Sequence, residues 1–175
     1  EALFLLEEPQ GQCDLLSGGT DYVVDLNEKR ILTPENLIYL GNISEMKFIR
    51  KKDSVIEIGA MVTHAELESD PLIRDVASLI SMAAESVGSP AIRAMGTIGG
   101  SLATASPAGD ISTALLAFDS QIILKRRADY RKIPLIDFFI GPGHTQLKPD
   151  ELIYSILIPL HEDQVTGQIF MKLGK

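Results

Sequence analysis

Short apolar blocks alternate with polar and glycine-rich stretches along the whole chain, and these blocks predict both helices and strands. Residues 1–8 are typical of a helix that is ended by the proline and glycine after it. Residues 13–26 begin as a short strand, pass through a glycine pair and continue as a second apolar segment. Residues 36–40 read as a short buried strand. Two partly alternating strands in residues 47–60 predict a hairpin, because the aspartate between them suits a turn.

The middle of the chain carries signals for two helix starts. Thr63 and Glu66 have the spacing of a capping box. Asp70 followed by Pro71 is typical of an N-cap and the first residue of a second helix. Apolar residues at helical spacing then predict a single helix that faces the core and ends near Gly88.

The second half of the chain is again mixed. It predicts a helix at 111–118, a strand at 120–127, an apolar segment that runs into a turn at 132–143, a strong strand at 151–160 and the start of another strand at 169–175. These elements do not follow a regular βαβ rhythm. The pattern therefore favours an α+β layered fold over a doubly wound parallel sheet.

Composition narrows the possible classes of protein. A chain of 175 residues predicts one domain or a tight pair of subdomains. A net charge of −8 argues against general nucleic-acid binding and against adhesion to acidic membranes, and no apolar run is long enough to span a membrane. The single cysteine, Cys13, cannot form an internal disulfide or hold an iron–sulfur cluster, and with the histidines it gives no zinc spacing. We therefore expect a cytoplasmic protein in which Cys13 is a small buried hydrophobic residue.

Two glycine pairs stand beside hydroxyl residues, in LLSGGTD (15–21) and GTIGGS (96–101). The second pair belongs to TIGGSLATASPAGD (97–110), which contains no Lys or Arg and has the composition of neither a strand nor a long helix, so we expect a loop. Glycine tolerates positive φ and lets successive N–H groups converge on an anion, while hydroxyls add neutral donors. Each pair alone is more typical of an ordinary tight turn, but two together indicate a diphosphate ligand. Neither pair matches a GxxxxGK[ST] phosphate loop or a GxGxxG dinucleotide motif.

Other candidate residues leave alternatives open. Asp110 either caps the helix that follows it or accepts hydrogen bonds from ligand hydroxyls. Arg93 either supplies a positive charge to the ligand or is a solvated or core-rim residue. His64, His144 and His161 are expected to be surface or partly buried residues rather than general bases. Because no catalytic residue and no metal ligand is assigned, a bound cofactor is the most economical source of chemistry.

Taken together, the motifs resemble a known family. The quoted segments are LLSGGTDYVV (15–24), IEIGAMVTHAELE (56–68), GSPAIRAMGTIGGSLATASPAGD (88–110) and PLIDFFIGPGHTQLKPDELIYSILIP (134–159). They are similar, in this order, to the FAD-binding (medium) subunit of the xanthine dehydrogenase and CO dehydrogenase family of molybdenum hydroxylases. The similarity spans most of the chain, and the TIGG…ASPAGD element is its most specific part.

The resemblance implies a two-lobed FAD-binding fold of the vanillyl-alcohol oxidase type. It divides the chain into a small N-terminal α/β lobe at 1–60 and a larger lobe built on a mixed sheet at 61–175, with FAD between them. The C-terminal subdomain expected after Lys175 is missing from this sequence.

The resemblance also assigns the cofactor-binding residues. It places the two glycine turns on opposite sides of the FAD pyrophosphate, further hydroxyls and one carboxylate along the cofactor, and two later residues near the isoalloxazine ring. In this order they are Ser17, Gly18, Gly19, Thr20 and Asp21 on one side, Thr97, Ile98, Gly99 and Gly100 on the other, Ser101, Thr104 and Asp110 along the cofactor, and Ile153 and Lys172 near the ring. The family usually has Asn where this chain has Ser101, and the shorter side chain is expected to weaken or reroute one hydrogen bond.

The implied role is electron transfer. A molybdenum-cofactor subunit hydroxylates a substrate, a 2Fe-2S subunit carries the electrons to this FAD, and the flavin passes them to NAD or another acceptor. A single cysteine agrees with iron–sulfur centres held by a partner.

Two alternatives stay open from the residues. One is a self-contained flavin oxidoreductase that resembles UDP-N-acetylenolpyruvoylglucosamine reductase. The other is a non-catalytic nucleotide-binding or assembly module, whose glycine turns bind a diphosphate or only turn the chain. Flavin absorbance of the purified protein separates the second from the rest.

Overall fold

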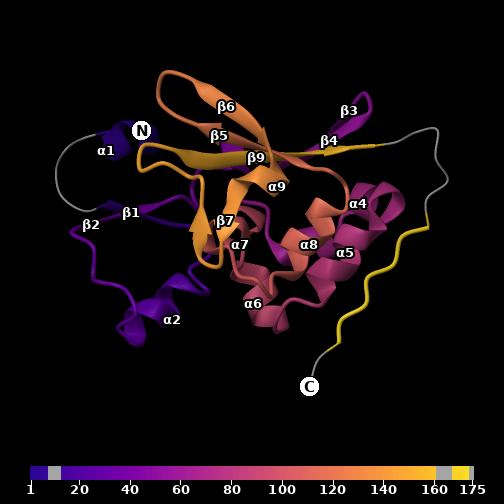
Figure 1. The fold of residues 1–175 in the computed structure, drawn as a ribbon, viewed down its shortest axis with the longest axis horizontal. Coiled ribbons are helices and arrows are strands. Elements are labelled where there is room, and N and C mark those ends of the chain that lie inside the picture. The colour runs from indigo at the N-terminus through magenta and orange to yellow at the C-terminus, as the bar shows by residue number, and fades with distance from the viewer. Residues whose placement is uncertain (8–12, 161–166, 174–175) are drawn as a thin grey trace.

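Helices pack against one face of an antiparallel sheet, and a small parallel pair of strands lies beside them (Figure 1). The computed structural model describes residues 1–7, 13–160 and 167–173. The strands are β1 (Cys13–Leu16), β2 (Asn36–Tyr39), β3 (Ile49–Lys52), β4 (Val55–Gly59), β5 (Gln121–Lys125), β6 (Tyr130–Pro134), β7 (Phe139–Gly141), β8 (His144–Thr145) and β9 (Leu152–Pro159). The helices are α1 (Ala2–Glu7), α2 (Tyr22–Asn27), the 3-10 turn η1 (Ser44–Met46), α3 (His64–Ser69), α4 (Pro71–Val76), α5 (Ser78–Glu85), α6 (Pro90–Met95), α7 (Ile98–Thr104), α8 (Asp110–Leu116) and α9 (Leu135–Phe138).

The main sheet has the order β3-β4-β9-β5-β6, and each pairing between these strands is antiparallel. The expectation of a mixed sheet was therefore wrong for this sheet. Strands β4 and β5 do run in the same direction, because each is antiparallel to β9. The helices between them form the crossover connection, and β9 fills the gap that the crossover leaves. A parallel pair is present only elsewhere in the described chain, between β1 and β2.

The core lies between this sheet and the helices. Strands β4 and β5 turn alternate residues toward it, as the period of two in a strand requires. In β9 both faces are largely buried, and its pairing with β5 contains a register shift. The fully buried apolar residues on these three strands are Ile56, Ile58, Ile122, Leu124, Ile156 and Ile158. Helix α5 presents Ile80, Ala83 and Ala84 to the same core. The strands predicted within residues 13–160 and the predicted α+β layering are thus present.

Both predicted helix starts in the middle of the chain are confirmed. The Thr63 hydroxyl accepts from the Glu66 amide while the Glu66 carboxylate accepts from the Thr63 amide, which is a complete capping box. Asp70 accepts from the amide of Ile73, and Pro71 is the first residue of α4. The single helix expected up to Gly88 is instead two helices, α4 and α5, because Ala77 leaves the helical region at φ −139° and ψ 46°.

The stretch 97–110 differs most from its prediction as a loop. It contains all of α7 and the start of α8. Thr97 is the N-cap of α7 and accepts from the Gly100 amide at 3.0 Å. A Cβ on Gly99 would lie 2.7 Å from the Cβ of Ala60, so the glycine lets the helix pack directly on the chain after β4. Close packing therefore outweighs the poor helix propensity of two glycines, about 1 kcal/mol each.

Two further predictions fall near the ends. The strand expected at 169–175 is absent from residues 169–173, which have no regular structure, and residues 174 and 175 lie outside the described residues. The predicted N-terminal helix is present as α1, but the Pro9 and Gly11 expected to end it lie outside the described residues. The division into lobes at residue 60 stays a prediction; β3 and β4, which precede that boundary, pair into the sheet that continues with β9.

Candidate functional site

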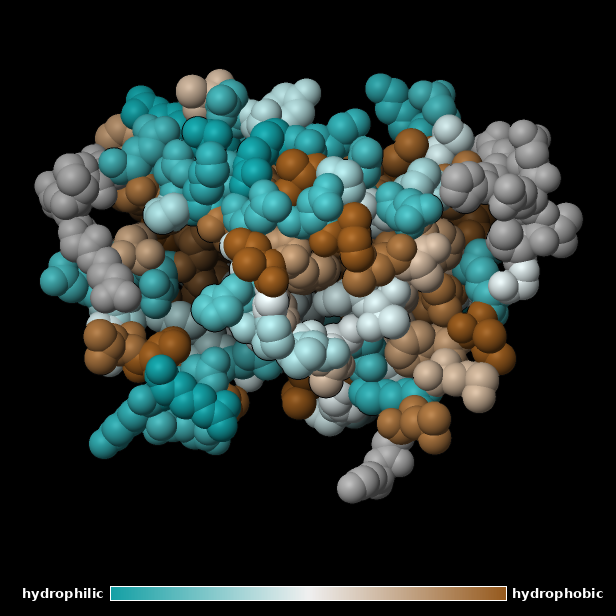
Figure 2. Space-filling model, viewed as in Figure 1, coloured by the Kyte–Doolittle hydropathy of each residue, from teal (hydrophilic) through white to brown (hydrophobic). Residues whose placement is uncertain are grey.

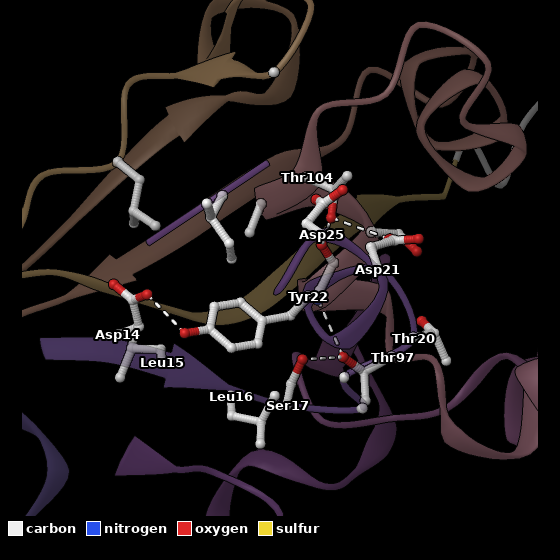
Figure 3. Close-up of a pocket in the computed structure, with 18 of the residues that line it drawn as sticks. Asp14, Leu15, Leu16, Ser17, Thr20, Asp21, Tyr22, Asp25, Thr97 and Thr104 are labelled. Carbon is white, nitrogen blue, oxygen red and sulfur yellow. Dashed lines mark hydrogen bonds between the residues drawn. The ribbon is translucent and has the colours of Figure 1, made fainter. Parts of the chain in front are cut away.

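The two predicted glycine turns, 80 residues apart in sequence, line one cavity of about 540 Å³. Figure 3 shows side chains of its wall, which come from β1, from the turn and the start of α2 that follow it, and from α7 with its N-cap Thr97. In the surface view the molecule is hollowed between the β7–β8 hairpin and the region of β1 and α2 (Figure 2). Nine of the fourteen predicted cofactor residues line this cavity: Ser17, Gly18, Gly19, Thr20, Asp21, Thr97, Gly100, Ser101 and Thr104.

The first turn, residues 17–21, presents open backbone donors to the cavity. Gly19 has φ +72°, a conformation that favours glycine. A Cβ on Gly18 would lie 1.9 Å from the carbonyl oxygen of Met95, so only glycine fits where this turn meets the end of α6. Among the described residues, the amides of Gly18, Gly19, Thr20 and Asp21 donate to no protein acceptor. Successive amides that are free in this way suit an anionic ligand.

The second glycine pair does not provide such amides, which corrects one part of the prediction. The Ile98 amide donates to Val62 and the Gly99 amide donates to Ala60, each at 2.9 Å. The Gly100 amide is used by the N-cap, and neither Gly99 nor Gly100 has positive φ. A Cβ on Gly100 would lie 2.8 Å from the Ser17 hydroxyl oxygen, so this glycine brings the two turns together instead of donating to a ligand. Ile98 is fully buried in the core.

Hydroxyl groups connect the two turns and face the cavity. Thr97 donates to the Ser17 hydroxyl at 3.3 Å, and Thr104 lies within hydrogen-bond distance of both Asp21 (3.2 Å) and the Gly100 carbonyl (3.0 Å), as the dashed lines of Figure 3 show for Ser17 and Asp21. These contacts fix the turns relative to each other. They leave Ser17, Thr20 and Ser101 as neutral donors on the cavity wall.

Two smaller cavities continue the first. One, of about 90 Å³, is mainly apolar, contains Ile153 and Gly99, and shares Leu15, Ser17, Gly100, Ala103 and Leu147 with the main cavity. The other, of about 180 Å³, contains Asp110 and shares Asp21, Ser101 and Thr104 with the main cavity. The three form a groove that is apolar toward Ile153 and hydroxyl-rich toward Asp110.

Asp110 and Lys172 meet each other within this arrangement. The Lys172 ammonium lies 2.6 Å from a carboxylate oxygen of Asp110. Lys172 lines none of the three cavities, so the structure does not bring it to Ile153, its predicted neighbour at the isoalloxazine ring. Asp110 is the first residue of α8, its N-cap is Gly109, and no side-chain cap bond is formed, so the capping interpretation of Asp110 was wrong.

The main cavity is acidic, with Asp14, Asp21, Asp25 and Glu151 on its wall and Lys148 as the sole cation among the described lining residues. Glu151 is neutralised by Arg131, whose guanidinium forms two bonds to it at 2.8 and 2.9 Å. Burial alone would raise the pKa of Glu151, but these bonds and the Lys148 amide hold it below its ordinary value. Donors to an anion here therefore come from amides and hydroxyls, as the absence of Lys and Arg in 97–110 predicts.

Several residues that the sequence does not single out also belong to the site. Tyr22, on α2, donates to Asp14 on β1 at 2.7 Å, and Figure 3 shows its ring pointing toward Asp14. Burial, followed by this bond and the charge of Asp14, raises the pKa of Tyr22 to about 12. The one feature of the sequence that could have pointed to this pair is Asp14 itself, a charged residue within an apolar strand. Nothing in the sequence pointed to Ala103 or Leu147, because small and apolar residues that line a groove cannot be distinguished by type from residues of the core.

The structure assigns none of the remaining candidate residues that it describes to the groove as a ligand cation or a metal ligand. Arg93 donates to Glu68 at 2.8 Å and to the carbonyls of Val87 and Gly88, so it is a core-rim residue and not a ligand cation. Cys13 is half-buried, and burial raises its pKa. His144 is exposed, and His161 lies outside the described residues. In the described part of the chain, no three His, Cys, Asp or Glu side chains gather as a metal site.

Comparison with known proteins agrees with this geometry. Residues 1–161 match the family described as "FAD binding domain in molybdopterin dehydrogenase". The chain belongs to this family. The predicted family and the predicted cofactor, FAD, are thereby confirmed, and the α+β fold is that of the family's FAD-binding domain.

Individual relatives are consistent with this family. The chain is 36% identical to the FAD-subunit of nicotinate dehydrogenase from Eubacterium barkeri over 92% of this chain and 55% of that protein. It is 32% identical to the medium chain of carbon monoxide dehydrogenase from Hydrogenophaga pseudoflava, over 100% of this chain and 60% of that one. The chain therefore spans a little over half the length of these curated relatives.

Solved structures give the same result. Carbon monoxide dehydrogenase from Hydrogenophaga pseudoflava, lacking the Mo-pyranopterin moiety of its cofactor, superimposes with a TM-score of 0.87 at 30% identity, covering 93% of this chain and 56% of that chain. Quinoline 2-oxidoreductase from Pseudomonas putida 86 gives a TM-score of 0.87 at 25% identity, covering 91% and 55%. In the described residues no helix is both long and apolar enough to cross a membrane.

Proposed function

We propose that this chain forms the FAD-binding part of an electron-transfer subunit in a molybdenum hydroxylase complex. The observation that carries the proposal is the groove whose wall combines residues 18–21, whose amides donate to no acceptor among the described residues, with the hydroxyls of Ser101 and Thr104 on α7. This groove lies within a chain of the FAD-binding family. The medium chain and FAD-subunit names of the relatives support a subunit role.

The groove fits FAD by the chemistry of its walls. Residues 17–21 and Ser101 would hold the pyrophosphate through amides and hydroxyls. Thr97 and Gly100 would fix the two walls relative to each other. Asp110, with Thr104 nearby, would hold sugar or ribityl hydroxyls, and the apolar cavity with Ile153 would take the isoalloxazine ring. The roles proposed for Ile98, Gly99 and Lys172 are indirect: Ile98 and Gly99 fix α7, and Lys172 fixes Asp110.

When bound, FAD supplies a redox centre that exchanges electrons with donors and acceptors. We propose that the donors are iron–sulfur centres of a partner subunit, that a molybdenum-cofactor subunit oxidises the substrate, and that NAD or another compound accepts the electrons. The names of two relatives, a medium chain and a subunit of a dehydrogenase complex, support an assembly of several subunits. The molybdenum cofactor named for a structural relative supports a molybdenum-containing partner. The vanillyl-alcohol oxidase type of two-lobed fold, and a location in the cytoplasm, belong to the same proposal.

Flavin binding tests the proposal directly. The purified protein is mixed with FAD, freed of excess ligand and examined for visible flavin absorbance and for quenching of flavin fluorescence. We expect about one FAD per chain. A protein that remains colourless at all FAD concentrations would instead favour the non-catalytic module.

The electron-transfer part needs the assembled complex. Co-expression with the proposed molybdenum-cofactor and iron–sulfur subunits should yield a complex that contains molybdenum and iron. Adding the substrate that the molybdenum-cofactor subunit hydroxylates should then bleach the flavin absorbance, because hydroxylation of the substrate releases the electrons. Bleaching in the isolated chain with NADPH and an organic substrate would point to a self-contained reductase.

A further inference from the structure

A fully buried histidine lies directly behind the cofactor groove and contacts one of its hydroxyls. His64, the first residue of α3, is 1% exposed, and its Nε2 lies 2.9 Å from the Ser101 hydroxyl oxygen on α7. Its backbone amide donates to the carbonyl of Gly96, just before the N-cap of α7. Ser101 lines both the main cavity and the Asp110 cavity, whereas His64 lines none of the three.

The other ring nitrogen of His64 has no partner. Nδ1 is buried and makes no hydrogen bond within the described chain. A neutral imidazole carries one hydrogen, so this hydrogen is either on Nδ1 or on Nε2. A hydrogen on Nδ1 would leave a buried N–H without an acceptor, which is rare in folded proteins. A hydrogen on Nε2 leaves only a lone pair unsatisfied and donates to Ser101.

The ring is also held in its neutral form. Burial lowers the pKa of His64 to about 4, although the Asp21 and Asp110 carboxylates act in the opposite direction. At neutral pH the imidazole therefore has one hydrogen to place.

We infer that His64 is a positioning residue that donates from Nε2 to Ser101 and thereby points the Ser101 hydroxyl hydrogen into the groove. The Ser101 hydroxyl makes no other hydrogen bond within the described residues, so its hydrogen is free for a ligand oxygen that only accepts, such as a phosphate oxygen. Thr97 and Thr104, by contrast, donate to protein oxygens. The inference rests on the proposed FAD site and names Ser101 as a hydroxyl of that site that donates to a phosphate oxygen.

The first test does not need the cofactor. Nitrogen-15 NMR of the ring in the full chain without FAD reports which nitrogen carries the hydrogen. We expect the Nε2–H form at pH 7 and no protonation down to pH 5. A ring with its hydrogen on Nδ1 would overturn the inference, whatever the chain's affinity for FAD.

The second test is a double-mutant cycle on FAD affinity. Ser101→Ala and His64→Leu should each weaken FAD binding by about tenfold, because each removes a donor to a charged oxygen or its orientation. The pair together should be no weaker than Ser101→Ala alone. Independent effects that multiply to about a hundredfold would show that His64 does not act through Ser101.

A conservative variant separates positioning from packing. Gln at position 64 carries an amide nitrogen at about the reach of Nε2, so His64→Gln should restore most of the affinity that His64→Leu loses. Equal loss in both variants would contradict the inference. If the unsubstituted protein fails to bind FAD at all, the proposed function fails, while the NMR result still decides the orientation of the Ser101 hydroxyl.

Discussion

At the scale of single residues, Gly18 shows most directly why the site needs glycine. The contact between its Cα and the end of α6 leaves no room for a side chain, since a Cβ would lie 1.9 Å from a carbonyl oxygen. The sequence analysis selected this glycine because glycine tolerates positive φ, whereas the structure requires it because no Cβ fits beside the Met95 carbonyl. Gly19 alone of the four paired glycines needs positive φ, and Gly18, Gly99 and Gly100 are required for close approach.

We predict that Gly18→Ala displaces the first turn and weakens FAD binding by at least about tenfold, with a loss of about 1–3 kcal/mol in stability from overpacking. Isothermal titration and urea unfolding measure the two effects. Gly141→Ala is the matched control, because nothing lies within 4 Å of its Cβ position and its φ is not positive. A Gly18→Ala protein with unchanged affinity would exclude the first turn from the site.

His64 predicts a pH dependence of stability. Its pKa is about 4 in the folded chain and 6.5 ordinarily, so the unfolded chain binds more protons between these values. Stability should therefore fall as pH falls from 6.5 to 4, by about 3 kcal/mol from this group. Urea unfolding of the parent and His64→Gln across this range measures the difference. Parallel curves for the two proteins would show that His64 does not titrate as expected.

At the scale of elements, the segment between β8 and β9 forms a wall of the groove and is fixed from behind. Arg131 on β6 donates to the buried Glu151 and to the Gln146 carbonyl, and the Lys148 amide donates to Glu151. Leu147, from this segment, lines both the main and the apolar cavity. The ion pair thus couples the hairpin β5–β6 to the site.

We predict that Arg131→Met destabilises the fold by about 3 kcal/mol or more, because it leaves a buried carboxylate with weaker partners. The double variant Arg131→Met, Glu151→Leu should recover part of this loss, since it leaves no buried carboxylate without its partner. Because the pKa of Glu151 is lowered in the folded chain, the stability from this pair is present above pH 4.5 and is lost as pH falls further. Urea midpoints at two pH values test this, and a loss under 1 kcal/mol in the single variant would contradict it.

The sequence predicted most elements but not their spatial arrangement. Capping residues such as Thr63 and Asp70 act locally, so their helix starts could be predicted. The break at Ala77 and the helical state of Gly99 depend on partners distant in sequence, which local patterns do not contain. For the same reason, the motifs pointed to residues of both glycine segments that line the groove, whereas the places of His64 and Tyr22 beside it depend on tertiary contacts.

At the scale of the whole molecule, the groove joins β1 and α2 to the rest of the chain. Among the described residues, two side-chain hydrogen bonds cross it, from Thr97 to Ser17 and from Thr104 to Asp21. A ligand that bridges both walls should therefore stabilise the entire fold.

We predict that FAD at a hundred times its dissociation constant stabilises the protein by about 2.7 kcal/mol. For a chain of this size this corresponds to an increase in melting temperature of about 5–10 °C. Scanning calorimetry at increasing FAD concentration measures the shift. AMP at the same molar concentrations serves as a control ligand that is too short to bridge the groove. An equal shift with AMP at equal concentration would show that contact with both walls adds nothing to the stabilisation.

The position of β9 in the centre of the sheet also affects how the chain is made. During synthesis β3 and β4 emerge first and can form their hairpin, but the inner edge of β4 has no partner until β9 leaves the ribosome. Until then, that edge exposes unpaired backbone groups to any neighbouring nascent chain. The period between translation of β4 and β9 is thus when this protein is most exposed to aggregation and to binding by chaperones.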